Sequence, residues 1–148
     1  MAIENNFQRI GAKNNTEVGR EFQTKARRYF ASQGIVLEPN VKVSVGSPPA
    51  PRLFSLGSHE PPILVMCKSL KWTGTENTPS AKIKTLNTVA MLFGLCDPRY
   101  RRIIFMLKDL RKGESLARYF VRTQGNLIGP GVEVWDFDPE GDVAERVH

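Results

Sequence analysis

Residues 53–69, which read LFSLGSHEPPILVMCKS, decide how the chain folds. The run 63–67 is apolar at every position, and a strand with two apolar faces has to be covered on both sides. We therefore predict a central strand over residues 63–67, preceded by a shorter strand over residues 53–56 that Gly57 closes. Lys68 ends the central strand and leads into a polar loop.

Upstream of this stretch, apolar residues recur at three- and four-residue spacing and predict a helix over residues 16–33 with one apolar face. The apolar positions are Val18, Phe22, Ala26, Tyr29 and Phe30. Valines alternate with polar residues over 41–45, which is typical of a strand with one buried face. Residues 46–51 contain three prolines and are expected to form a loop, because proline cannot donate to a central ladder.

Downstream, Ser80 is expected to cap a second helix, and residues 103–107 predict a second buried strand. A third helix is expected over 114–122 and a late, partly exposed strand over 132–137. The acidic tail over 138–148 has no apolar pattern and is expected to fray.

In chain order these elements are a helix, three strands, a helix, a strand, a helix and a strand. This order is typical of an α/β fold in which a mixed central sheet is flanked by helices. We expect a single domain over residues 1–148, with its core in residues 16–137.

Charge is uneven along the 148 residues, whose net charge is +6. Residues 68–124 carry twelve Lys or Arg against four Asp or Glu, whereas residues 125–148 carry one against six. A basic middle segment with an acidic tail favours a polyanionic partner, although solvated charges alone give the same pattern. The two cysteines favour a reducing compartment, and we expect a cytoplasmic protein without a membrane span or secretory signal.

Several catalytic and cofactor motifs are absent from the sequence: a Walker-type loop, a Gly-rich dinucleotide motif, CxxC and HExxH. His59 and His148 are the only histidines, which disfavours a histidine metal site or a Ser-His-Asp triad. Lys68 remains as the candidate for chemistry, since a lysine that ends a buried strand can orient a phosphate or activate water. Alternatively, its stem only covers the end of the sheet while its ammonium group reaches water.

The stretch 53–69 resembles the central hairpin of PD-(D/E)XK nucleases, above all their restriction and homing endonuclease branches. That motif has an aspartate on one strand, and then an acidic residue, a spacer and a lysine on the next. Ser55 takes the aspartate position, Met66 the second acidic position, Cys67 the spacer and Lys68 the lysine.

Many relatives also carry a glutamate on the preceding helix, four residues after a glycine. Counted from Gly19, that position is Gln23. The resemblance spans residues 16–137 and implies a restriction endonuclease-like core of the order αβββαβ, with one helix and one late strand added.

The resemblance implies a metal-dependent endodeoxyribonuclease. Such an enzyme needs clustered carboxylates, because these are the hard oxygen ligands that Mg²⁺ prefers. Here a hydroxyl, a thioether and a neutral amide stand at the acidic positions, so Lys68 alone remains of the catalytic set. We therefore expect no bound metal and a phosphodiester cleavage that is lost or impaired. Glu21 and Glu60 are the nearby acids that could substitute, but Glu21 projects away from Gln23 and Glu60 lies on the turn between the motif strands.

Losing three carboxylates lowers the repulsion of DNA phosphates, which favours DNA binding without metal. The residues expected to contact DNA lie in the loop after Lys68 and at the start of the next helix: Lys71, Trp72, Asn77, Lys82 and Lys84. Trp72 has a second interpretation, as a loop anchor packed on the core. Five arginines are expected to give either further backbone contacts or solvated faces: Arg99, Arg101, Arg102, Arg118 and Arg122.

The sequence thus predicts a protein that binds double-stranded DNA on a nuclease-like fold. Two alternatives stay open: an active Mg²⁺-dependent endonuclease that uses other acids, and a non-catalytic module that binds protein through the acidic tail. The resemblance also implies a homodimer or a homotetramer.

Overall fold

The computed structural model describes residues 15–72 and 78–148. The elements of its N-terminal half are α1 (Asn15–Ser32), β1 (Glu38–Val45), β2 (Ala50–His59), β3 (Pro62–Lys68) and α2 (Ser80–Gly94). The elements that follow are β4 (Arg101–Leu107), β5 (Leu110–Arg111), β6 (Glu114–Ser115), α3 (Leu116–Gln124), the 3-10 turn η2 (Gly125–Leu127), β7 (Val132–Asp138) and β8 (Val143–Arg146).

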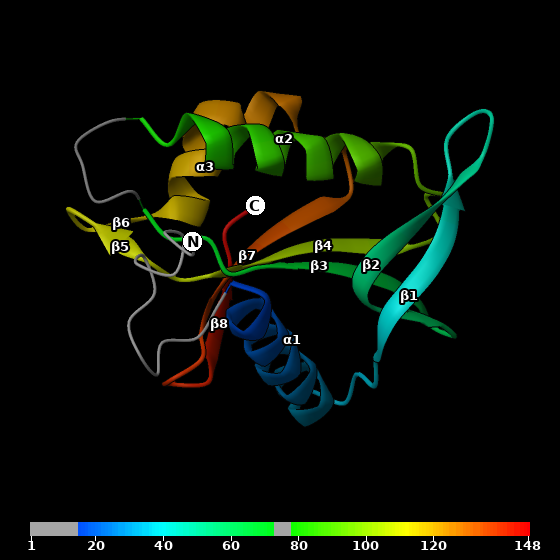
Figure 1. Ribbon diagram of the computed structural model, residues 1–148, viewed down its shortest axis with the longest axis horizontal. Coiled ribbons are helices and arrows are strands. Elements are labelled where there is room, and N and C mark those ends of the chain that lie inside the picture. The colour runs from blue at the N-terminus through cyan, green and yellow to red at the C-terminus, as the bar shows by residue number, and fades with distance from the viewer. Residues whose placement is uncertain (1–14, 73–77) are drawn as a thin grey trace, which may run out of the picture.

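Six strands form one mixed sheet in the order β1-β2-β3-β4-β7-β8. The β3–β4 and β4–β7 pairs are parallel, and the other three pairs are antiparallel. Helix α1 covers one face, and α2 and α3 cover the other (Figure 1). This arrangement confirms the expected α/β class with a mixed sheet, and it places β3 and β4 side by side at the centre.

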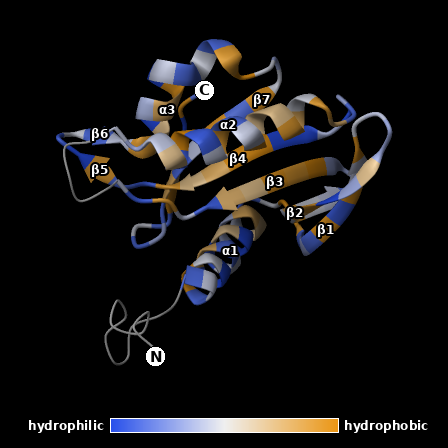
Figure 2. Cartoon of the chain, turned by 45° about the horizontal axis from the view of Figure 1, so that its top comes forward, coloured by the Kyte–Doolittle hydropathy of each residue, from blue (hydrophilic) through white to orange (hydrophobic). Residues whose placement is uncertain are grey.

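Each face of the sheet has its own apolar core. On the α1 face, Phe22, Ala26 and Phe30 pack at helical spacing against strand residues such as Phe105 and Phe137. On the opposite face, side chains of α2 and α3 pack against Phe54, Leu64, Ile104 and Met106, among others. Figure 2 shows β3 and β4 as hydrophobic along most of their length, as strands covered on both faces must be.

Strand β2 is longer than expected at both ends. Ala50 and Pro51 belong to it and pair with Val45 and Ser44, so residues 46–51 are not all loop. The proline is tolerated there because β2 pairs with β3 only from Leu56 onward, so one side of the strand lacks a neighbour at that level.

Two helix starts also differ from expectation. Ser80 is the first residue of α2 and its side chain makes no cap hydrogen bond, because Pro79 occupies the cap position. Helix α3 begins at Leu116 rather than at residue 114, and Ser115 caps it by accepting from the backbone N–H of Arg118. Glu114 instead pairs with Arg111 in the short β5–β6 hairpin, which the apolar pattern did not indicate.

The expectations for the C-terminal part were wrong in two respects. Strand β7 is mostly buried rather than partly exposed, because β4 and β8 flank it. The tail does not fray completely: residues 143–146 form β8, antiparallel to β7, and the N–H of Val147 donates to Val134 O at 2.8 Å. Among the described residues, no helix is long and apolar enough to cross a membrane.

Candidate functional site

A polar cleft of about 530 Å³ lies between α1 and the nearby strands β1, β2 and β3. Helix α1 contributes Thr16, Gly19, Arg20, Gln23, Thr24 and Arg27, and the strands contribute Pro39, Asn40, Ser55, Leu56 and Cys67. The α1 residues recur at helical spacing beside the apolar stripe. One face of the helix therefore packs on the core while the adjacent face lines the cleft.

The cleft exists because the sheet is irregular around Ser55. The β1–β2 pairing passes from Pro39–Leu56 to Val41–Phe54, and the β2–β3 pairing ends at Leu56. Asn40 has a φ of 56°, in the left-handed region that asparagine tolerates better than most residues. Phe54 and Leu56 consequently enter opposite cores, although regular alternation would put them on one face.

Hydrogen bonds hold Ser55 and Gln23 in this irregular region. Gln23 Nε2 donates to Ser55 O at 2.6 Å and to Asn40 Oδ1 at 3.2 Å. Ser55 Oγ accepts from the backbone N–H of Cys67 at 2.9 Å and lies 3.9 Å from Met66 Sδ. The structure thus brings together three of the four motif positions, namely Gln23, Ser55 and Met66.

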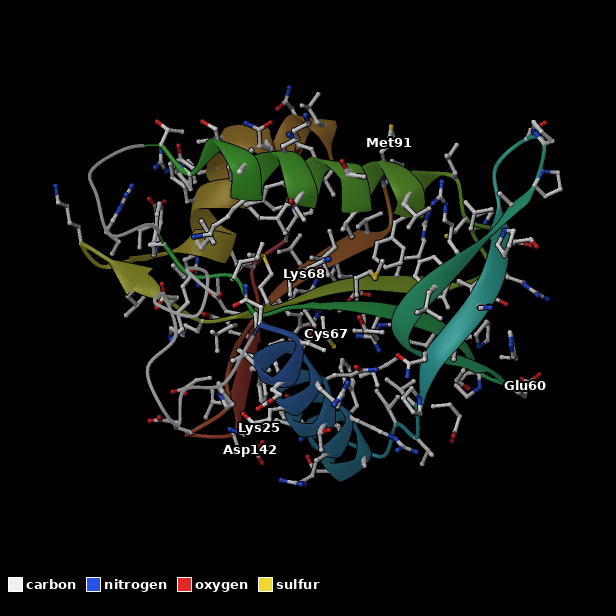
Figure 3. The ribbon with its side chains drawn as sticks, viewed as in Figure 1. Lys25, Glu60, Cys67, Lys68, Met91 and Asp142 are labelled. Atoms are coloured by element: carbon white, nitrogen blue, oxygen red, sulfur yellow. The ribbon has the colours of Figure 1, made fainter. Side chains whose placement is uncertain are left out.

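Lys68 shares the face of β3 with Met66 and points away from the cleft. In the β3–β4 register, Lys68 pairs with Met106 and Met66 pairs with Ile104. Met106 and Ile104 both belong to the core under α2 and α3. Figure 3 shows Lys68 on the α2 side of β3 and Cys67 on the α1 side. Met66 and Lys68 are therefore not among the described residues that line the cleft, whereas Cys67 is.

Cys67, taken as a mere spacer from the sequence, is thus a cleft residue. Burial raises the pKa of its thiol to about 12, against smaller lowering effects from the Ser55 hydrogen bond and the charge of Lys68. The thiol is therefore neutral at physiological pH and is a poor nucleophile. Neighbouring residues of a strand point to opposite faces, so Cys67 could have been predicted to face away from Met66 and Lys68.

The side chains around Ser55 do not fit Mg²⁺. A hydroxyl, an amide, a thioether and a neutral thiol lack the anionic oxygens that this ion prefers. Glu21 lines a different hollow along α1, and Glu60 lies at the far end of the β2–β3 hairpin from Lys68 (Figure 3). Within residues 15–72 and 78–148, no cluster of three His, Cys, Asp or Glu side chains is suited to a metal ion.

The residues expected to contact DNA differ in their surroundings. Trp72 is an anchor: its backbone N–H donates to Asp109 Oδ2, its indole N–H donates to Glu114 O, and its ring packs edge-on against Tyr119. The Arg111 guanidinium lies 3.8 Å from the centre of the Trp72 ring. Lys71 and Lys84 are exposed, Lys82 is half-buried, and Asn77 lies outside the described residues.

The five arginines mostly serve the fold. Arg101 makes two hydrogen bonds to Glu133, and buried Arg102 donates to Phe93 O and Pro130 O. The remaining three form ion pairs, which are Arg99–Asp97, Arg118–Glu145 and Arg122–Glu114. Glu133 and Glu145, both within the acidic segment 125–148, thus neutralise part of the basic middle segment.

Arg20 is the site residue that sequence reasoning missed. It lines the cleft three positions before Gln23 and seven before Arg27, a helical spacing that could have indicated it.

No protein-family model matches the chain, and neither a curated protein nor a solved structure is significantly similar to it.

Proposed function

We propose that this protein binds double-stranded DNA on a restriction endonuclease-like fold and does not cleave it efficiently. The element order α1-β1-β2-β3-α2-β4 is the order that the resemblance implies. Ser55 contacts both Gln23, through its backbone carbonyl, and Met66, through its hydroxyl. The resemblance implies carboxylates at these three positions. A nuclease core whose acidic positions are neutral supports binding over hydrolysis, because no anionic ligand set is left for the metal.

The DNA partner is inferred from five lysines at the carboxyl ends of β3 and β4 and in the first turns of α2, here called the basic edge: Lys68, Lys71, Lys82, Lys84 and Lys108. Strands β3 and β4 are parallel and level with each other, so Lys68 and Lys108 follow the same edge of the sheet. Helix α2 begins on this side as well (Figure 1).

The carboxylates near the basic edge have partners, and buried Asp136, which accepts from Ser115, also interacts with the charge of Lys108. Asp109 accepts the backbone N–H of Trp72, and Glu114 is paired with Arg122. The cleft adjoins the edge at the end of β3, where Cys67 lines the cleft and Lys68 starts the edge. A row of lysines of this kind is suited to a phosphate backbone, which contributes most of the affinity in non-specific DNA binding.

Supercoiled plasmid DNA tests this proposal. We expect the protein to retard the plasmid in EDTA, and we expect deproteinised samples to remain supercoiled after incubation with Mg²⁺ or Mn²⁺. Nicking that requires metal would instead favour an active endonuclease. A lack of retardation even at low salt would favour a protein-interaction module.

A pair of double variants tests whether the basic edge is the contact surface. Lys71→Gln/Lys84→Gln removes two charges from the edge, and Lys25→Gln/Arg28→Gln removes two from the outer side of α1. The edge variant should flatten the dependence of log affinity on log salt by about 2, because two phosphate contacts are lost. The control variant should leave the slope unchanged, and equal slopes for the two variants would contradict the assignment.

A further inference from the structure

We propose that the cleft beside α1 binds one internal phosphodiester group of duplex DNA without a divalent cation, and that Arg20 supplies the positive charge there. The inference deepens the proposed DNA binding and rests on it. It assigns a phosphate-binding role to a helix residue outside the nuclease-like motif.

The described lining of the cleft contains two arginines, Arg20 and Arg27, and no carboxylate. Arg20 also borders the neighbouring hollow along α1, which Glu17 and Glu21 line. Arg27 is already engaged, because its Nε donates to Leu37 O at 2.7 Å and its guanidinium lies 3.6 Å from Glu38. The exposed Arg20 guanidinium makes no ion pair or hydrogen bond with any residue in the described part of the chain. It is therefore the cation that an incoming anion would meet.

Two hydrogen-bond donors of the strands, on Ser55 and Asn40, line the same cleft as Arg20. Ser55 Oγ uses an oxygen lone pair on the N–H of Cys67, while its hydrogen has only the sulfur of Met66, at 3.9 Å, as a partner. Thioether sulfur is a weak acceptor, so this hydroxyl is available to a phosphate oxygen. Asn40 accepts from Gln23 through Oδ1, which leaves its NH₂ group as a second donor.

The walls of the cleft are fixed to one another by hydrogen bonds of Gln23. Gln23 links the α1 wall of the cleft to both β1 and β2 through its bonds to Asn40 and to Ser55 O. The donors therefore stand on a helix and two strands that are fixed to one another before any ligand arrives. A guanidinium group can hold a phosphate with two parallel hydrogen bonds, which suits it to an anion where no metal bridges.

The test compares Arg20→Gln with Lys25→Gln, which removes an equal charge from a helix residue that does not line the cleft. Binding is measured in EDTA by fluorescence anisotropy of a labelled duplex closed by hairpins at both ends, so that no terminal phosphate is present. Arg20→Gln should weaken binding about tenfold, as expected for a lost charge-assisted hydrogen bond, and should lower the salt slope by about 1. Lys25→Gln should change neither quantity.

A second pair of variants tests the cleft itself. A Cβ at Gly19 would meet no atom within 4 Å, so a side chain can start there without a clash. Gly19→Glu puts a negative charge at the mouth of the cleft, and Gly19→Gln adds nearly the same volume without charge. We expect Gly19→Glu to weaken binding at least tenfold relative to Gly19→Gln.

The outcomes separate this inference from the proposed function. If the unmodified protein does not bind DNA, the proposed function fails. If it binds, but Arg20→Gln behaves like Lys25→Gln or Gly19→Glu behaves like Gly19→Gln, only the cleft assignment fails. The Arg20→Gln variant could instead lose affinity only for a linear duplex with 5′-phosphates. That result would show a terminal phosphate site and would overturn the assignment to an internal phosphodiester.

Discussion

Ser55 and Met66 are the residues at which the proposed loss of a metal site is most directly tested. Their side chains approach to 3.9 Å, so carboxylates at both positions would lie close enough to share one cation. Ser55→Asp/Met66→Glu should therefore create binding of Mn²⁺ or Mg²⁺ that calorimetry detects. It should also weaken metal-free DNA binding, because two negative charges are added near the phosphate path.

The double variant should lower the free energy of unfolding by roughly 1–3 kcal/mol without metal, because Met66 is half-buried. Ser55→Asn/Met66→Gln is the control of similar size without charge. It should bind no metal and should retain DNA binding. Equal metal binding by both double variants, or by neither, would show that these positions do not form a metal site.

At this scale the sequence predicted more of the contacts than of the orientations. The resemblance placed Ser55, Met66 and Lys68 at one end of the sheet with Gln23 nearby. Hydrogen bonds and a sulfur contact join Gln23, Ser55 and Met66. Met66 and Lys68, however, both face the α2 side of the sheet and do not line the cleft. Asn40 could not have been foreseen, because its role depends on a left-handed backbone and on strands that stop pairing at this point.

Among the elements, β7 carries two buried carboxylates whose pKa values shift in opposite directions. Burial raises the pKa of Glu133, but hydrogen bonds from Arg101 and Trp135 outweigh that effect, so its pKa lies below the usual 4.5. For Asp136, burial outweighs the hydrogen bond from Ser115, and its pKa lies above the usual 3.8. The two side chains should therefore give the unfolding free energy opposite dependences on pH.

Arg101→Gln should lower the free energy of unfolding by about 2 kcal/mol at pH 7, since it removes two charged hydrogen bonds from Glu133. A lowered pKa in the folded state gives stability that is present above pH 4.5 and is lost as the pH falls through the lowered value. Urea unfolding should show the variant and the unmodified protein converging as the pH falls below 4.5 towards the lowered pKa. A difference that stays constant with pH would contradict this account.

Asp136→Asn should show the opposite trend. A raised pKa gives stability that is present below pH 3.8 and is lost as the pH rises through the raised value. The asparagine cannot ionise and can still accept from Ser115, so its stability relative to the unmodified protein should increase from pH 3 to pH 7. The expected change is on the order of 1 kcal/mol. A flat difference would mean that Asp136 carries no shifted pKa.

The elements that the sequence predicted well are those with a strong apolar period. Helix α1 and strands β3 and β4 lie within a few residues of their expected positions, because each buries a regular set of large side chains. The end of the chain was harder to predict. Strand β8 has only four residues and mostly exposed side chains, and backbone pairing to β7 forms it rather than any apolar pattern.

For the molecule as a whole, net charge is a poor guide to the charge available to a partner until the internal ion pairs are known. The arginines of β4 and α3 are largely committed to Glu133, Glu145 and Glu114. Lys71, Lys84 and Lys108, by contrast, are exposed, and Lys68 is half-buried. The proposal of a polyanionic partner, first suggested by the uneven charge of the sequence, therefore rests on this smaller group of lysines and on Arg20.

The most direct test of metal-free DNA binding is the affinity for a labelled duplex in EDTA, measured by anisotropy as the salt concentration increases. We predict binding at low salt with log affinity falling linearly against log salt, and with no gain when Mg²⁺ is supplied at constant ionic strength. Binding that appears only with Mg²⁺, or no binding at about 50 mM salt, would contradict the claim that this chain binds DNA without a metal ion.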